Sequence, residues 1–155
     1  MSDTSLLDNP DILRSMIMDH YQYPRNHGLV ESSDYQQVNM NSSTCIDNID
    51  VQAKFSGDVI EDIRFDGEAC AICTSSTSIM TELLIGKTTD EAKVIIENYM
   101  NMIYEKEYDE DLLDEAIAFQ NTYKQANRIK CATLGWKAIE KLMILKTGGV
   151  IDEQD

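Results

Sequence analysis

The stretch IDVQAKFSGDVIEDIRF (residues 49–65) decides the fold. Its first half alternates apolar and polar side chains strictly, which is the pattern of a half-buried β-strand. Ser56-Gly57-Asp58 is a turn signal, and residues 59–65 have the composition of a return strand. We therefore predict an antiparallel β-hairpin. Its apolar side chains are Ile49, Val51, Ala53 and Phe55 on the first strand, and Val59, Ile63 and Phe65 on the second.

Helical patterns flank this hairpin on both sides. Asn9-Pro10 has the form of an N-cap followed by proline at the first helical position, and Pro24 ends that helix. Residues 26–43 are polar and rich in turn formers, so we predict a loop there. Four further helices are expected after the hairpin: from Thr74 to Gly86, from the Thr88/Glu91 capping box onward, over about 111–119, and over about 128–145.

These elements predict an α+β fold, with a small antiparallel β-sheet packed against helices. The 155 residues fit one domain with a real hydrophobic core, and we expect residues 1–8 and 147–155 to be disordered tails. No stretch approaches the roughly 20 apolar residues of a membrane span, and the N-terminus lacks the pattern of a secretory signal. We therefore expect a cytoplasmic protein, in which thiols stay reduced.

The chain is strongly acidic. Aspartate and glutamate number 28 against 13 lysines and arginines, which gives a formal charge of −15. A polyanion of this size repels nucleic acids and anionic membranes, so we exclude both as partners. The charge favours a partner with a basic surface.

The four cysteines lie in three short clusters, at residues 44–47, 70–73 and 130–133. Cys45 and Asp47 are two residues apart, so both project to one side of an extended segment. Cys70 and Cys131 fall at predicted helix starts, where the helix dipole favours a thiolate. Because the hairpin brings residues 47 and 70 together, three thiolates and one carboxylate could hold a zinc or iron ion.

The competing interpretation is that each cysteine is a small buried apolar residue. We prefer it for Cys73, which shares a helix face with Met80 and Leu84. The Cys-x-x-Cys formed with Cys70 also fits a thioredoxin-like redox motif, but an antiparallel hairpin precedes it and not a βαβ unit. Spacing alone leaves the metal site and the buried cysteines both open. Neither histidine is assigned to a metal, because His20 is expected in helix packing and His27 in an exposed turn.

Ordered motifs along nearly the whole chain resemble a known family. They are Met18-Asp19-His20-Tyr21, Pro24-Arg25-Asn26, Thr44-Cys45-x-Asp47, Gly67-Glu68-x-Cys70, Gly86-Lys87-Thr88 and Arg128-Ile129-Lys130-Cys131-Ala132-Thr133. The chain resembles the SufU-type branch of the IscU/NifU N-terminal family of iron–sulfur cluster assembly proteins. Lys130 stands where IscU carries a histidine, the Leu-Pro-Pro-Val-Lys motif is absent, and residues 102–127 match the SufU-type insertion.

The resemblance implies an IscU/SufE-like fold and a sulfur carrier, not an independent enzyme. It implies zinc as the cofactor, Cys45 as the acceptor of persulfide sulfur, and Arg128 as a residue that supports the site and docking. The implied partners are a SufS-type cysteine desulfurase and downstream iron–sulfur assembly components. The implied zinc ligands are Cys45, Asp47, Cys70 and Cys131.

Two other functions stay open beside this one. The first is a scaffold that binds iron or an iron–sulfur cluster through Cys45, Cys70 and Cys131. The second is a structural zinc module that only binds a partner. The sequence also departs from the family pattern at three places: Ile46 and Ala69 replace usual glycines, and Cys73 replaces a usual serine.

Overall fold

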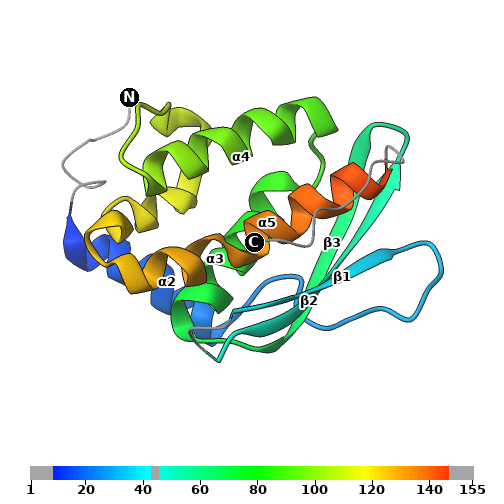
Figure 1. The fold of residues 1–155 in the computed structure, drawn as a ribbon, viewed down its shortest axis with the longest axis horizontal. Helices are drawn as coiled ribbons and strands as arrows, with labels where there is room; N and C mark the ends of the chain where they lie inside the picture. Colours follow the sequence, from blue (N-terminus) through cyan, green and yellow to red (C-terminus); the bar gives the residue numbers. More distant parts are fainter. Residues whose placement is uncertain (1–8, 43–45, 147–155) are drawn as a thin grey trace.

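The computed structural model describes residues 9–42 and 46–146, which form an α+β structure (Figure 1). The strands β1 (Gln36–Asn41), β2 (Asn48–Ser56) and β3 (Val59–Glu68) form one antiparallel sheet in the order β1-β2-β3. The α-helices are α2 (Pro10–Gln22), α3 (Ala71–Leu84), α4 (Thr89–Ile103) and α5 (Ala126–Lys146). Three short 3-10 helices lie between the last two: η1 (Glu110–Leu112), η2 (Asp114–Phe119) and η3 (Thr122–Lys124).

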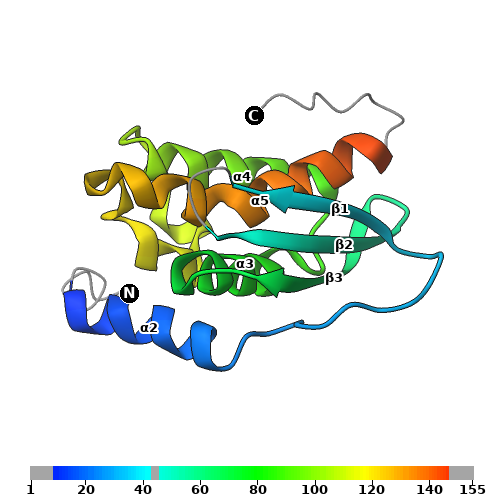
Figure 2. The ribbon, with the colours of Figure 1, turned by 60° about the horizontal axis from the view of Figure 1, so that its bottom comes forward.

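The α+β prediction is confirmed, and the helices build on the sheet in layers. α5 packs on β1 and β2, α3 packs on β3, and α2 and α4 pack against α3 and α5 respectively (Figures 1 and 2). Within the described ranges, no helix combines the length and the apolar character that a bilayer crossing needs. The expected tails at 1–8 and 147–155, like Cys45, lie outside the described residues, so the single-domain assignment stays a prediction.

The predicted hairpin is confirmed, with one irregularity. Ala53 pairs with Ile63 but Phe55 pairs with Ile60, so β3 carries one extra residue at a bulge. A single extra residue exchanges the two faces of a strand. Ile60 is therefore fully buried, and Val59, which we expected on the buried face, is 36% exposed.

The prediction of a continuous loop over residues 26–43 is wrong, because residues 36–41 form β1. β1 pairs on one side only, with β2, and just two of its six residues are apolar. Such an edge strand is held by backbone hydrogen bonds to its neighbour more than by a buried face, so the hydrophobic pattern is weak. Within it, Met40 is the one fully buried side chain.

The helix predicted over about 111–119 is present as two short 3-10 helices and not as one continuous helix. The segment consists of the 3-10 helices η1 and η2, and Asp114, the first residue of η2, has a φ of 46°. A left-handed residue cannot continue a right-handed helix. The apolar residues from Ala116 to Phe119 are nevertheless buried, so the segment contributes to the core as the pattern indicated.

The remaining helix predictions are confirmed. The Asn9 side chain caps α2 by accepting from the Asp11 amide, and Thr88 and Glu91 form both halves of a capping box at α4. α5 begins at Ala126, slightly before the expected Arg128. Thr133 of α5 is buried although it is polar, and its hydroxyl donates to the Ile129 carbonyl at 2.9 Å.

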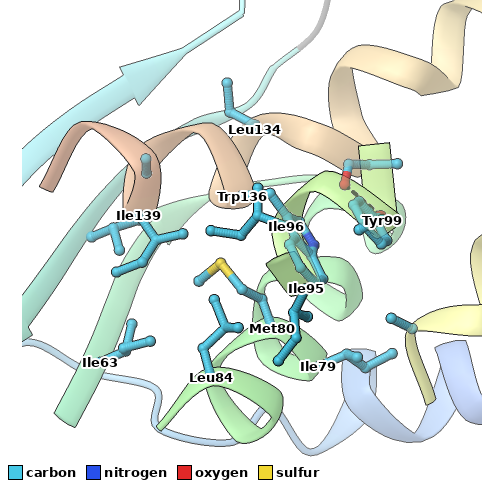
Figure 3. Packing of buried hydrophobic residues seen from close by; sticks show 14 of the residues in the cluster. Ile63, Ile79, Met80, Leu84, Ile95, Ile96, Tyr99, Leu134, Trp136 and Ile139 are labelled. Atoms are coloured by element: carbon cyan, nitrogen blue, oxygen red, sulfur yellow. Dashed lines mark hydrogen bonds between the residues drawn. The ribbon is translucent and has the colours of Figure 1, made fainter. Parts of the chain in front are cut away.

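The core centres on the stacked rings of Trp136 and Tyr99, whose centroids lie 3.8 Å apart (Figure 3). Beside these rings α5 crosses α3 closely at Gly135. A Cβ atom added to Gly135 would lie 2.3 Å from Thr77 Oγ1 and 3.0 Å from Thr77 Cβ. The absence of a side chain at Gly135 thus sets the separation of the two helices.

We predict that Gly135→Ala destabilises the fold by about 1–3 kcal/mol, because the added methyl group overpacks the crossing. This loss opposes the gain of up to about 1 kcal/mol that alanine brings to a helix interior. Urea denaturation measures the net effect. Thr77→Ala in the same background removes the two nearest atoms and should restore part of the stability. Equal losses in the single and the double variant would show that the crossing is not the cause.

Candidate metal centre

Three of the four predicted ligands meet at one point. One ligand atom from each of Asp47, Cys70 and Cys131 lies within 4.8 Å of the others. Asp47 and Cys131 are almost fully buried, at 1% and 3% exposure, and Cys70 is partly exposed. The centre is therefore enclosed on two sides and accessible from the Cys70 side.

The hairpin places Asp47 beside Cys70, as the sequence predicts. Asn48 pairs with Glu68, so the residue before β2 and the residues after β3 are neighbours. Gly67 allows this approach: its φ is +130°, and a Cβ atom there would lie 2.3 Å from the Asn48 carbonyl oxygen. The Cys70 amide then donates to Asp47 Oδ1 at 2.8 Å.

The Cys70 sulfur lies at the N-terminus of α3. Cys70 is the N-cap, and its Sγ accepts from the Cys73 amide at 3.4 Å. The predicted place of Cys70 at a helix start is confirmed.

The prediction that Cys131 begins a helix is wrong. α5 begins at Ala126, so Cys131 lies in its second turn, beyond the unpaired amides. Its side chain nevertheless faces the protein body, since Cys131 is 3% exposed. Its Sγ lies 3.9 Å from the Asn127 carbonyl oxygen.

The donor set fits zinc. Tetrahedral zinc with bonds of about 2.3 Å to sulfur and 2.0 Å to oxygen requires neighbouring donor atoms about 3.5–3.8 Å apart. Cys70 Sγ lies 3.9 Å from Asp47 Oδ2, close to that separation. The other carboxylate oxygen is the one that accepts from the Cys70 amide, and such a bond to the second oxygen orients a ligating carboxylate.

Cys45 lies outside the described residues, but both ends of its segment are described. The Ser42 amide donates to the Asp47 carbonyl at 3.0 Å, which closes the connection from β1 to β2. Ile46, which stands where the family usually has glycine, is 67% exposed. A large apolar side chain thus lies in water directly beside the centre.

A buried hydrogen-bond cluster around Ser76 joins the two helices that position Cys70 and Cys131. Trp136 Nε1 donates to Ser76 Oγ at 3.1 Å, and the Ser76 hydroxyl donates to the Ala132 carbonyl at 2.6 Å. The Tyr99 hydroxyl donates to the same carbonyl at 2.7 Å. Burial holds the pKa of Tyr99 far above its usual range, so the phenol keeps its proton. Because Ala132 follows Cys131, this cluster fixes α5 against α3 beside the ligands.

Four other residues that the sequence pointed to are not among the three clustered ligands. Cys73 is fully buried in the core, as predicted, and His20 is fully buried between α2 and α3. His27, predicted in an exposed turn, has 43% of its side chain exposed. Arg128 is exposed on α5, three residues before Cys131 and therefore on the same side of the helix. A role for Ser76 was not predicted, although the run of small hydroxyl residues inside a helix is visible in the sequence.

We predict that Ser76→Ala weakens zinc binding by about tenfold, because it leaves the Trp136 indole without its acceptor and loosens the two helices. Competition with a zinc chelator measures the affinity. Ser75→Ala is the matched control, since Ser75 is equally buried but its hydroxyl bonds to backbone carbonyls of its own helix, at Ala71 and Ile72. Equal zinc affinities for the two variants would contradict the role given to Ser76.

Comparison with known proteins places the chain in a family. The profile of the NifU-like N-terminal domain matches residues 12–144. The zinc-dependent sulfurtransferase SufU of Bacillus subtilis is 41% identical over 150 residues, covering 96% of this chain and 99% of that protein. The iron–sulfur cluster assembly scaffold protein IscU of Streptococcus pyogenes is 36% identical over 128 residues, covering 82% and 79%.

A solved structure agrees with this placement. The crystal structure of a SufU chain from the thermophile Fervidobacterium islandicum AW-1 superposes with a TM-score of 0.75 at 32% identity, covering 90% of this chain and 98% of that one. The fold, the profile and the sequence identity all lead to one conclusion. The chain belongs to the family of the NifU-like N-terminal domain, in its SufU-type branch.

Proposed function

We propose that this protein is a zinc-binding sulfur acceptor, which takes persulfide sulfur from a cysteine desulfurase for iron–sulfur cluster assembly. The observation that carries the proposal is the meeting of Asp47, Cys70 and Cys131 within 4.8 Å. The name of the Bacillus subtilis relative, a zinc-dependent sulfurtransferase, supports both the metal and the reaction class.

Cys45 is the fourth ligand in this proposal. Two residues of extended chain span at most about 7 Å, so the Cys45 backbone is tied to the neighbourhood of Asp47 by covalent connection alone. Bound zinc would keep the thiols of the set deprotonated at neutral pH. The full set of ligands is Cys45, Asp47, Cys70 and Cys131.

The transfer step belongs to Cys45. Its thiolate attacks the outer sulfur of the desulfurase persulfide, so that a new S–S bond forms on Cys45 while the S–S bond on the desulfurase breaks. The desulfurase cysteine leaves as a thiolate, and no net oxidation occurs. Cys70 and Cys131 are less suited to this role, because Cys131 is buried inside α5 and Cys70 is fixed at the start of α3.

The surface around the centre supports docking of a partner. Ile46 offers an exposed apolar contact, and Arg128 offers a charged one on the same side of α5 as Cys131. The formal charge of −15 favours a basic patch on the desulfurase, which we propose to be of the SufS type. The protein is then a co-substrate of that enzyme and not an independent catalyst. We place the reaction in the cytoplasm, where thiols remain reduced.

We predict that Cys45→Ala abolishes stimulation of a SufS-type desulfurase, because the persulfide loses its acceptor. Alanine and persulfide formation are measured with and without the protein. The matched control is Cys73→Ala, which removes a fully buried thiol from the core and should retain stimulation. Stimulation that persists in the Cys45 variant would contradict the acceptor assignment, and a zinc module that merely binds a partner would raise turnover in neither form.

A cluster scaffold is the second candidate function, favoured by the Streptococcus pyogenes relative, which is named as an assembly scaffold. Anaerobic purification separates the two. We expect a colourless protein with about one zinc per chain. A brown protein with iron and sulfide in place of zinc would support the scaffold and contradict the zinc-dependent acceptor.

A further inference from the structure

A second cluster of metal-ligating side chains lies at the other end of α3. His20 of α2, Glu82 of α3 and Glu115 of η2 place one ligand atom each within 4.8 Å of the others. Three separate elements thus converge on one point. Glu82 lies twelve residues beyond Cys70, so the two clusters are about 18 Å apart along the helix.

The histidine ring is fixed before any ligand arrives. His20 is fully buried, and its Nδ1 lies 2.7 Å from Ser78 Oγ, which also accepts from the Arg25 amide at 2.8 Å. A hydrogen bond at one ring nitrogen sets the orientation of the other, as it does for histidines that ligate metals. Nε2 therefore faces the two carboxylates.

A single proton on His20 Nε2 cannot bond to both carboxylates. Nε2 lies 3.3 Å from Glu115 Oε2 and 3.8 Å from Glu82 Oε1, so a single N–H can bond only the nearer carboxylate. When Nδ1 donates to Ser78, Nε2 presents a lone pair to two negative groups. A cation placed among the three atoms contacts all of them, and bonds of about 2.1 Å give ligand separations of about 3.0–3.5 Å.

The two carboxylates of the cluster are accessible to solvent. The side chains of Glu82 and Glu115 are 47% and 40% exposed, so water can complete the coordination. The nearby Arg25 guanidinium is engaged mainly elsewhere, at 2.7 Å from Asp19 and 3.0 Å from the Tyr23 carbonyl, and its Nε is 3.9 Å from Glu82.

We propose that His20, Glu82 and Glu115 form a second divalent-cation site, free of thiolates and suited to Mn²⁺ or Fe²⁺. One imidazole with two carboxylates is a harder donor set than the sulfur-rich centre at the other end of α3, which selects zinc. The molecule thus separates two metals of different character. The site stands independently of the function proposed for the thiolate centre.

The test is a MnCl₂ titration of the zinc-loaded protein, in which the electron paramagnetic resonance of free Mn²⁺ reports binding. We expect one Mn²⁺ per chain, and an affinity at least about tenfold lower in both Glu82→Gln and Glu115→Gln. Glu110→Gln is the matched control, because it removes the same charge from an exposed residue of η1. Equal affinities in the control and the site variants would show adventitious binding to an acidic surface and overturn the proposal.

A second readout uses the unaltered protein beside one variant. Bound Mn²⁺ in the unaltered protein should show magnetic coupling to an imidazole nitrogen, and His20→Gln should remove it. Coupling that is absent from the unaltered protein would overturn the site. Coupling that survives in a folded His20 variant would do the same.

Discussion

The close crossing of α3 and α5 sets the distance between Cys70 and Cys131, and the candidate metal centre depends on that distance. Gly135 lets the two backbones approach at Thr77, and the hydrogen bonds around Ser76 hold them there. The stacked rings of Trp136 and Tyr99 pack beside this crossing. A metal site needs its sulfur atoms within a few tenths of an ångström of their ideal positions, and here a rigid, fully buried core supports them.

The hairpin supplies the other half of the centre. β2 and β3 deliver Asp47 and Cys70 to the same end of the sheet, and Gly67 removes the side chain that would hold the two strands apart. Sulfur chemistry is thereby confined to one end of α3. At its other end the cluster of His20, Glu82 and Glu115 offers nitrogen and oxygen atoms, with His20 as its buried member. One helix carries two chemically distinct clusters because its ends contact different parts of the fold.

The sequence predicted the elements that have strong periodicity or strong caps. Alternation identified β2, and the capping box identified the start of α4 to the residue. β1 was not predicted, because an edge strand with two apolar residues lacks a hydrophobic pattern. The bulge that buries Ile60 was not predicted either, because the residue composition does not indicate it. The convergence of Asp47 with Cys70 followed from the hairpin alone. The position of Cys131 and the role of Ser76 required tertiary contacts between helices far apart in sequence, and spacing does not encode these contacts.

We propose above all that three sulfur atoms and one carboxylate oxygen share one zinc ion. X-ray absorption at the zinc edge of the purified protein tests it most directly, because the technique counts the atoms bound to the metal. We expect three sulfur neighbours at about 2.3 Å and one oxygen at about 2.0 Å, with one sulfur lost in Cys45→Ala. A first shell made only of oxygen and nitrogen, or a shell with two sulfurs that Cys45→Ala leaves unchanged, would contradict it.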